Sequence, residues 1–348
     1  MGRSWMRLIG ETAATIEHPY LYDVVVVELG TDGPGQMKQF AYIKPDITVL
    51  TAVSPEHMEF FGTLDRVAEE ELIVFDYSKR VLVNGDDIPA KYLVGRSFTE
   101  YSLLTNVAHN YYAHTAEHSL EGQLLQLEFP SGKIETTTKL IGGQGAKIAL
   151  AAAATADMLG HSRLIIKQSL PEVEAFAGRM RVLPGFNTST IIDDTYNASP
   201  APVERGLDVL YGAPASQRIV ILGSMNELGD YSRVAHREVG AYCNPHKLDM
   251  VVTIGGDARR WLAPAALEAG CQVHSFMSPY DAGEFVRKHV KVGAVILAEG
   301  SQNGVFAEEA VKVLLAHPGD STKLVRQSEW WLRKKAKQFE RHQGLSKR

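Results

Sequence analysis

Two short segments in the second half of the chain join apolar runs to polar residues of the kinds that bind ligands. Residues 191–200 are Ile-Ile-Asp-Asp-Thr-Tyr-Asn-Ala-Ser-Pro, and residues 221–229 are Ile-Leu-Gly-Ser-Met-Asn-Glu-Leu-Gly. In each, an apolar run ends in polar residues, joined by glycine in the second segment, and a helical pattern follows. Parallel sheets present ligand-binding groups in this way, at the carboxyl ends of their strands. The segments therefore predict a site at one edge of a parallel sheet.

The first segment supplies most of the candidate residues. Asp194 ends the predicted strand, and Tyr196, Asn197 and Ser199 belong to the turn that follows it. Ser199 is suited to cap the next helix and Pro200 to its first position, so that free backbone N–H groups would face the site. A helix cap alone would explain Ser199 and Pro200, but not the acidic pair and the Tyr-Asn before them.

A second group of candidates lies upstream. Arg179 precedes the first segment at a predicted domain junction, and its guanidinium has a fork of donors suited to ribose or phosphate oxygens. Glu28 lies at the end of the apolar run 23–29, and His57 lies in the segment that follows the run 47–51. A carboxylate and an imidazole at one sheet edge can jointly hold a divalent cation. Taken alone, the arginine is more often a solvated charge, and the Glu–His pair a structural hydrogen bond.

Hydrophobic patterns predict an α/β protein whose two halves are organised differently. The run 23–29 is predicted to be a buried parallel strand, because its valines are consecutive rather than alternating. The other elements expected in the first half are strands at 47–51 and 80–83, a helix at 64–75, antiparallel strands between 107 and 138, and a helix at 146–159. Beyond a boundary near 171–178 the alternation of elements predicts a doubly wound sheet. Its strands are expected at 190–193, 218–223, 249–254, 271–275 and 293–298, and its helices at 201–211, 232–243, 257–269, 280–290 and 305–315.

Composition and charge exclude several classes of protein. The 348 residues, 45% of them hydrophobic, can bury two domain cores. A net charge of −5 gives no electrostatic reason to bind nucleic acid. Cys243 and Cys271 lack metal-ligand spacing, no apolar run is long enough to span a membrane, and no signal-peptide pattern is present. A cytoplasmic protein without a nucleic-acid partner is therefore expected.

These motifs closely resemble the Mur ligases. The stretch from residue 28 to residue 57 is similar to the central ATP-binding domain of the family. Residues 191–200 and 221–229, with His236, are similar to its C-terminal domain. The resemblance implies an N-terminally incomplete central domain over 1–175, a doubly wound, Rossmann-like C-terminal domain over 176–323, and a basic tail over 324–348.

The resemblance also implies cofactors and roles for the candidate residues. ATP and Mg²⁺ are expected as cofactors, since the matching family residues bind magnesium beside the acyl phosphate and contact the nucleotide. Glu71 replaces a carbamylated lysine of the family, so it is either a working substitute or a solvated helix charge. The residues implied are Glu28 and His57 for the metal, His57 and Glu71 for catalysis, and Arg179, Asp194, Tyr196, Asn197 and Ser199 for the nucleotide.

The implied activity is an ATP-dependent ligation in peptidoglycan synthesis. It would add D-alanyl-D-alanine to UDP-N-acetylmuramoyl-tripeptide, and these two molecules are the expected partners. The sequence contains no glycine-rich loop ending in Gly-Lys-Thr, however, and the similar residues 142–147 have no Ser or Thr after the lysine, so packing is their preferred interpretation. Ala149, Ser224, Glu299 and Gln302 also replace family residues. The alternative is a catalytically incomplete relative that acts as a binding or regulatory subunit. A dinucleotide oxidoreductase is disfavoured because no Gly-x-Gly-x-x-Gly follows a predicted strand.

The end of the chain has a character of its own. From Lys323 onward it carries nine basic and two acidic residues together with the pair Trp330 and Trp331. This pattern predicts a basic amphipathic helix whose tryptophans pack on the domain, and a membrane-binding or partner-binding role is the alternative.

Overall fold

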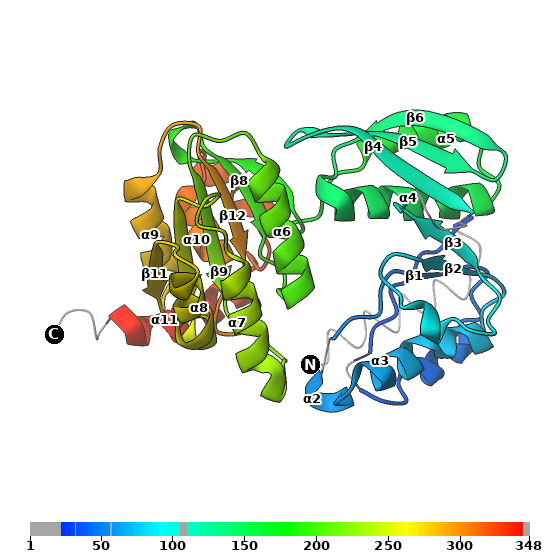
Figure 1. Cartoon of the computed structure of the whole chain (residues 1–348), viewed down its shortest axis with the longest axis horizontal. Helices are drawn as coiled ribbons and strands as arrows, with labels where there is room; N and C mark the ends of the chain where they lie inside the picture. Colours follow the sequence, from blue (N-terminus) through cyan, green and yellow to red (C-terminus); the bar gives the residue numbers. More distant parts are fainter. Residues whose placement is uncertain (1–21, 32, 56–57, 105–109, 344–348) are drawn as a thin grey trace.

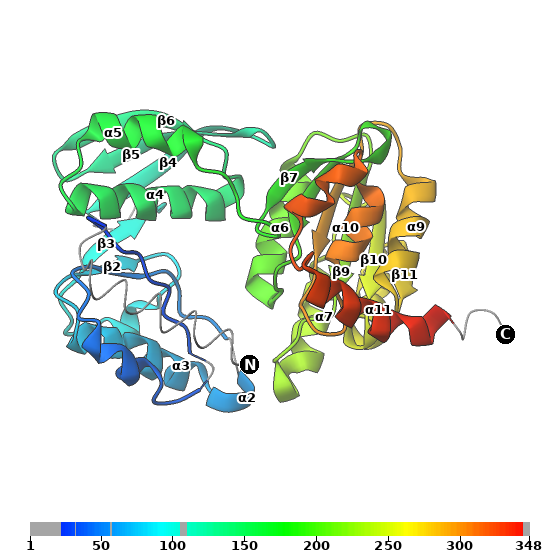
Figure 2. The ribbon, with the colours of Figure 1, turned by 180° about the vertical axis from the view of Figure 1, so that it is seen from behind.

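The computed structural model describes residues 22–31, 33–55, 58–104 and 110–343. This part of the chain forms two six-stranded sheets, one in each half, and helices pack on both (Figure 1, Figure 2). The sheets confirm an α/β fold. None of the helices in the described ranges is both long enough and apolar enough to cross a membrane.

The N-terminal sheet has the strand order β1-β2-β3-β4-β5-β6, with β1 to β4 parallel and β4, β5 and β6 antiparallel. Its strands are β1 (Thr48–Leu50), β2 (Val81–Asn84), β3 (Thr99–Ser102), β4 (Tyr111–Ser119), β5 (Gly122–Phe129) and β6 (Gly132–Thr138). The helices of this half are η1 (Met37–Tyr42), α2 (Met58–Phe61), α3 (Leu64–Glu71), η2 (Leu72–Asp76), η3 (Ala90–Tyr92), α4 (Gly142–Met158), α5 (Arg163–Ser169) and η4 (Leu170–Glu172). The antiparallel margin expected between 107 and 138 is confirmed.

Helix α4 forms because its sequence is rich in alanine, the strongest helix former. Its small side chains let the helix approach the sheet closely, and Ala146, Leu150 and Ala153 are buried against Leu125 and other apolar residues of the strands. The helix begins at Gly142, four residues before the predicted start, because the Gly-Gly-Gln-Gly segment itself is helical.

The C-terminal sheet has the order β11-β10-β9-β12-β8-β7, in which only β7 is antiparallel to its neighbour. Its strands are β7 (Arg181–Pro184), β8 (Thr190–Asp194), β9 (Arg218–Gly223), β10 (Met250–Ile254), β11 (Val273–Phe276) and β12 (Val295–Glu299). The helices are η5 (Phe186–Thr188), α6 (Pro200–Gly212), η6 (Gly229–Tyr231), α7 (Ser232–Tyr242), the π-helix η7 (Ala258–Leu262), α8 (Ala263–Glu268), α9 (Pro279–His289), α10 (Glu308–Leu314), η8 (Pro318–Lys323) and α11 (Glu329–Gln343).

Two apolar layers hold this sheet between its helices. Helices α6, α7 and α8 cover one face, where Ile192 and Val220 are buried, and α9 and α10 cover the other, where Ile191 and Ile219 are buried (Figure 1). Successive residues of a strand point to opposite faces, so both members of each pair are buried. The expected doubly wound sheet is confirmed.

The buried strand predicted at 23–29 is wrong. Residues 22–30 belong to no strand of the structure, and Val24, Val25, Val26 and Val27 are 47%, 71%, 92% and 52% exposed. A run of valines becomes a buried strand only where other chain segments flank it and cover both faces. In the described residues the strand order starts at β1, and no strand pairs with this run.

The two halves also meet away from the segment 171–180 that joins them, here called the hinge. Arg205 Nη1 of α6 lies 3.9 Å from Oδ1 of Asp87, which follows β2 in the first half. Helix α4 packs against α6, and α2 packs against η6. The carboxyl edge of β2 therefore faces the C-terminal half of the chain.

Candidate functional site

The turn after β8 is tied to the hinge by Asp193. This carboxylate is fully buried; Oδ2 accepts a hydrogen bond from Gly178 N at 3.2 Å, and Oδ1 accepts one from Thr195 Oγ1 at 2.6 Å. Burial raises the pKa of Asp193 to about 6, although these hydrogen bonds oppose the shift. Asp193 therefore fixes the turn but has no access to a ligand.

Asp194, Arg179 and Tyr196 lie together at the hinge. Asp194 is 9% exposed, and its Oδ1 accepts a hydrogen bond from Met180 N at 3.1 Å. Burial raises the pKa of Asp194 to about 6, and the charge of Arg179 partly counters this rise. The Arg179 guanidinium lies over the Tyr196 ring, 4.2 Å from its centre, and both side chains are exposed. A carboxylate, a guanidinium fork and an exposed ring thus share one rim.

The predicted cap by Ser199 is wrong. Ser199 is the residue before α6, but its side chain makes no capping hydrogen bond. An N-cap hydroxyl accepts from the second or third helical N–H, and here the third residue is Pro202, which has none. Because Pro200 also lacks an N–H, Ala201 provides the only backbone donor among the first three residues. The helix start is therefore a poor anion site, and Asn197, which is exposed, lies beside it.

The loop 223–229 is held by the turn that follows β12. Asn226 N donates to Ser301 Oγ at 3.0 Å, and Asn226 Nδ2 donates to the carbonyls of Gln302 and Asn303. Ser224 Oγ accepts from Ala258 N at 3.0 Å. These hydrogen bonds fix the carboxyl ends of β9 and β12 relative to each other. Asn226 and Ser224 of the loop are therefore already hydrogen-bonded within the protein.

His236 has a structural role in the same loop. Its Nε2 accepts from Met225 N at 3.0 Å, its Nδ1 lies 2.7 Å from Ser232 O, and the side chain is fully buried. An imidazole that accepts at Nε2 and donates at Nδ1 is neutral. Burial lowers the pKa of His236, which agrees with that state.

Glu299 is the feature that sequence reasoning missed. It lies opposite Asp194 in the parallel pairing of β12 with β8, it is 1% exposed, and neither carboxyl oxygen has a hydrogen-bond partner in the described structure. Gly206 makes the room for it, since a Cβ there would overlap Glu299 Oε1. Burial, and then the charge of Asp194, raise the pKa of Glu299 well above 4.5.

We expect Glu299→Gln to stabilise the protein more at pH 8 than at pH 5. A folded-state pKa raised above the unfolded value contributes stability that is complete below pH 4.5 and is lost as the pH rises through the folded pKa. The variant should avoid that loss, which is about 1.4 kcal/mol for each unit by which the pKa is raised. Urea unfolding of both proteins at the two pH values measures the difference. A difference that does not change with pH would contradict the assignment.

The structure describes two of the three candidate residues of the first half. Glu28 is exposed in the segment without a strand partner, Glu71 is half-buried in the last turn of α3, and His57 lies outside the described residues. Over the described ranges, no three His, Cys, Asp or Glu side chains lie together so as to hold a metal ion. The predicted Glu28–His57 metal site therefore stays a prediction.

Two other charged residues of the first half have clear structural roles. Glu70, 6% exposed, accepts hydrogen bonds from Gly35 N and Met37 N, each at 2.7 Å, and so ties the loop after residue 30 to α3. Lys147, the lysine of the Gly-Gly-Gln-Gly-Ala-Lys segment, pairs with Asp87 at 2.8 Å and lies 3.7 Å from Asp86. The packing interpretation of that segment agrees with these contacts.

Comparisons with known proteins identify the family. Residues 12–156 match the Mur ligase middle domain, and residues 178–302 match the Mur ligase glutamate ligase domain. The chain belongs to the Mur ligase family. It is similar to UDP-N-acetylmuramoyl-tripeptide–D-alanyl-D-alanine ligases of two bacteria. The relative from Haemophilus influenzae is 29% identical, and the match covers 67% of this chain and 51% of the relative. The relative from Bacillus subtilis is 25% identical, and the match covers 91% of this chain and 70% of the relative.

Solved structures share the fold. MurF from Acinetobacter baumannii superimposes with a TM-score of 0.69 at 23% identity, covering 80% of this chain and 61% of that one. The MurF ligase of Thermotoga maritima, solved in complex with ADP, gives 0.65 at 20% identity and covers 81% and 64%. The chain thus spans from about half to 70% of the length of these relatives.

Proposed function

We propose that this chain carries the nucleotide-facing and C-terminal part of an ATP-dependent ligase that joins D-alanyl-D-alanine to UDP-N-acetylmuramoyl-tripeptide. The observation that supports this most directly is the grouping of Arg179, Asp194 and Tyr196 at the hinge. The names of the relatives from H. influenzae and B. subtilis indicate the substrates. We further propose domains over 1–175 and 176–323, followed by the tail 324–348.

Each residue of the rim has a part that its chemistry suits. The Asp194 carboxylate accepts hydrogen bonds from ribose hydroxyls, and the Arg179 fork donates to ribose or phosphate oxygens. The exposed Tyr196 ring, stacked on Arg179, forms one wall of the nucleotide site, and Asn197 and Ser199 complete its edge.

In the proposed reaction a carboxylate oxygen of the tripeptide attacks the γ-phosphorus of ATP, giving an acyl phosphate and ADP. The amine of D-alanyl-D-alanine then attacks the acyl carbon, an amide bond forms, inorganic phosphate leaves, and the amine gives up a proton. Mg²⁺ would neutralise phosphate charge, with Glu28 and His57 as its proposed ligands and Glu71 beside them.

The second candidate function is a catalytically incomplete relative that binds nucleotide or partner. It is favoured by the substitutions at Ser224, Glu299 and Gln302. The structure gives Ser224 and Glu299 buried positions in the C-terminal half. A nucleotide-binding role and a ligase role both require the rim of Arg179, Asp194 and Tyr196. Only a measurement of catalytic turnover distinguishes the two roles.

The nucleotide rim can be tested by calorimetric titration with ADP and Mg²⁺. We expect Arg179→Ala and Asp194→Asn each to weaken binding about 10- to 100-fold, the cost of losing a charge-assisted hydrogen bond. The control is Arg181→Ala, since Arg181 Nη1 donates instead to Lys323 O at 3.3 Å. If the wild type and the three variants bind ADP with equal affinity, the rim does not form the nucleotide site.

A further inference from the structure

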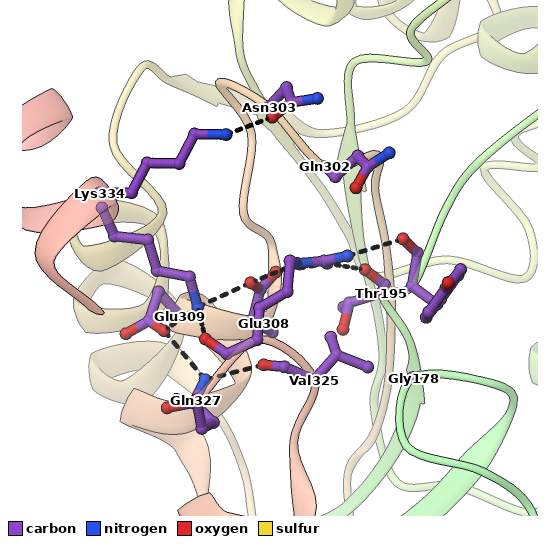
Figure 3. A network of polar contacts seen from close by, with 12 residues as sticks. Gly178, Thr195, Gln302, Asn303, Glu308, Glu309, Val325, Gln327 and Lys334 are labelled. Atoms are coloured by element: carbon purple, nitrogen blue, oxygen red, sulfur yellow. Dashed lines mark hydrogen bonds and ion pairs between the residues drawn. The ribbon is translucent and has the colours of Figure 1, made fainter. Parts of the chain in front are cut away.

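The segment before α11 reaches back to the turn after β8 (Figure 3). Arg326 Nη1 donates to Tyr196 O at 2.8 Å, and Nη2 donates to Thr195 O. On its other side Nε and Nη2 donate to the two carboxylate oxygens of Glu308, at 2.8 and 2.9 Å. One guanidinium therefore bridges the first residue of α10 and two consecutive carbonyls of the turn.

Arg326 is itself held in place by α11. Its φ of 54° lies in the left-handed region, which a residue with a side chain keeps only where its surroundings impose it. Lys335 Nζ donates to Arg326 O at 2.9 Å and pairs with Glu308 at 2.8 Å and Glu309 at 2.7 Å. The side chains of Lys335 and Glu308 are 0% exposed, and that of Arg326 is 6% exposed.

The same segment packs against the hinge. A Cβ at Gly178, whose φ is +67°, would lie 2.8 Å from Tyr196 N and 2.9 Å from Val325 Cγ1. Tyr196 N donates to Gly178 O at 3.0 Å. The hinge, the turn and the C-terminal segment thus meet where no methyl group fits, and the backbone of Tyr196 is held by Gly178 on one side and by Arg326 on the other.

We propose that Arg326 is a positioning residue for the nucleotide-facing rim. By fixing the carbonyls of Thr195 and Tyr196 it sets the direction of the Tyr196 ring and of the Arg179 guanidinium stacked on it. Because Lys335 of α11 holds the backbone of Arg326, the C-terminal helix contributes to the geometry of the site and does not merely pack on the domain. The proposal rests on the proposed nucleotide binding.

A purely stabilising role makes a different prediction. If Arg326 served only to attach α11 to α10, its loss would raise amide exchange throughout the domain and leave nucleotide affinity unchanged well below the melting temperature. A positioning role predicts a local change at 178–180 and 194–197 together with weaker nucleotide binding. The segments in which amide exchange rises therefore distinguish a stabilising role from a positioning role.

The test compares the wild type with Arg326→Gln, Arg326→Lys and the control Arg333→Gln, whose ion pair with Glu329 is exposed. Hydrogen–deuterium exchange is followed by mass spectrometry, and ADP with Mg²⁺ is titrated. Arg326→Gln should speed exchange at the turn and hinge about 10- to 100-fold, with β9 and β10 unchanged, and weaken ADP binding at least about tenfold. Arg326→Lys, which keeps the charge but not the fork, should be intermediate. Arg333→Gln should match the wild type.

Exchange at 194–197 that is unchanged, or that rises equally in β9 and β10, would overturn the proposal. If Arg326→Gln does not fold, the same comparison of exchange at 194–197 with exchange in β9 and β10 is made for Arg326→Lys and Glu308→Gln. If the wild type binds no ADP, the proposed nucleotide site is wrong, and the exchange pattern alone still decides whether Arg326 positions the turn.

Discussion

With ATP, Mg²⁺, UDP-N-acetylmuramoyl-tripeptide and D-alanyl-D-alanine present, the 348-residue chain alone is expected to release no ADP above background. Phosphoryl transfer depends on donors fixed around the transferring group, and removing one such donor typically costs about 10²–10³ in rate. These residues contain no glycine-rich loop ending in Gly-Lys-Thr. The segment 142–147, which most resembles one, begins α4, and its lysine is paired with Asp87 at 2.8 Å.

ADP release in a coupled assay is the measurement, with single-component omissions as controls. Turnover that needs all four components and disappears in both His57→Ala and Arg179→Ala would contradict the expectation. It would establish ligase activity in this chain and a phosphate site other than the family loop. Nucleotide binding without turnover would favour the second candidate function for the isolated chain.

The C-terminal sheet could be predicted from sequence because its signals are local. Strands β8, β9, β10 and β12 are apolar runs buried on both faces, and such a run marks the strand almost to the residue, as for β9 at 218–223. Strand β7, four residues ending in Pro184, was missed because it pairs at the sheet edge and has no apolar run.

The N-terminal error has a physical cause. The valines at 24–27 have strong β propensity, but whether such a run is buried depends on the strands beside it, which the run itself does not encode. The Ser199 error was avoidable, since Pro202 at the third helical position removes the N–H that a serine cap needs.

The ion network at the C-terminus could not be predicted from sequence. Arg326 and Thr195 are 131 residues apart, and nothing in the tail distinguishes Arg326 and Lys335 from the exposed basic residues beside them. Glu299 was noted only as a substitution, because its burial follows from Gly206 on another element. The prediction that the tryptophans of the tail pack on the domain is confirmed for Trp331, whose ring lies 6.0 Å from that of Phe306, and is wrong for Trp330, which is 63% exposed.

We expect Lys335→Met to destabilise the protein by about 3–5 kcal/mol, because the buried carboxylates of Glu308 and Glu309 would then share one buried cation, Arg326, instead of two. Lys335 is 0% exposed, and its ammonium lies 2.8 Å from Glu308 and 2.7 Å from Glu309. Burial alone would raise the pKa of Glu309, but the hydrogen bond and charge of Lys335 outweigh it, and the pKa is lowered. Such a group stabilises the fold above its unfolded pKa of 4.5, and this stability is lost as the pH falls through the folded value.

Urea unfolding at pH 7 measures the loss, and a double-mutant cycle assigns it. Glu309→Gln in the Lys335→Met background should recover part of the stability, because it removes the carboxylate that has lost its closest cation, whereas Glu308 keeps its pair with Arg326. The matched control is Arg333→Met on the same helix, whose pair with Glu329 is 76% and 80% exposed, so its change should stay below about 1 kcal/mol. If Lys335→Met costs no more than that control, the buried cluster does not anchor α11. The C-terminal helix would then be attached by its apolar contacts, with Phe339 and Phe306 as the residues to change next.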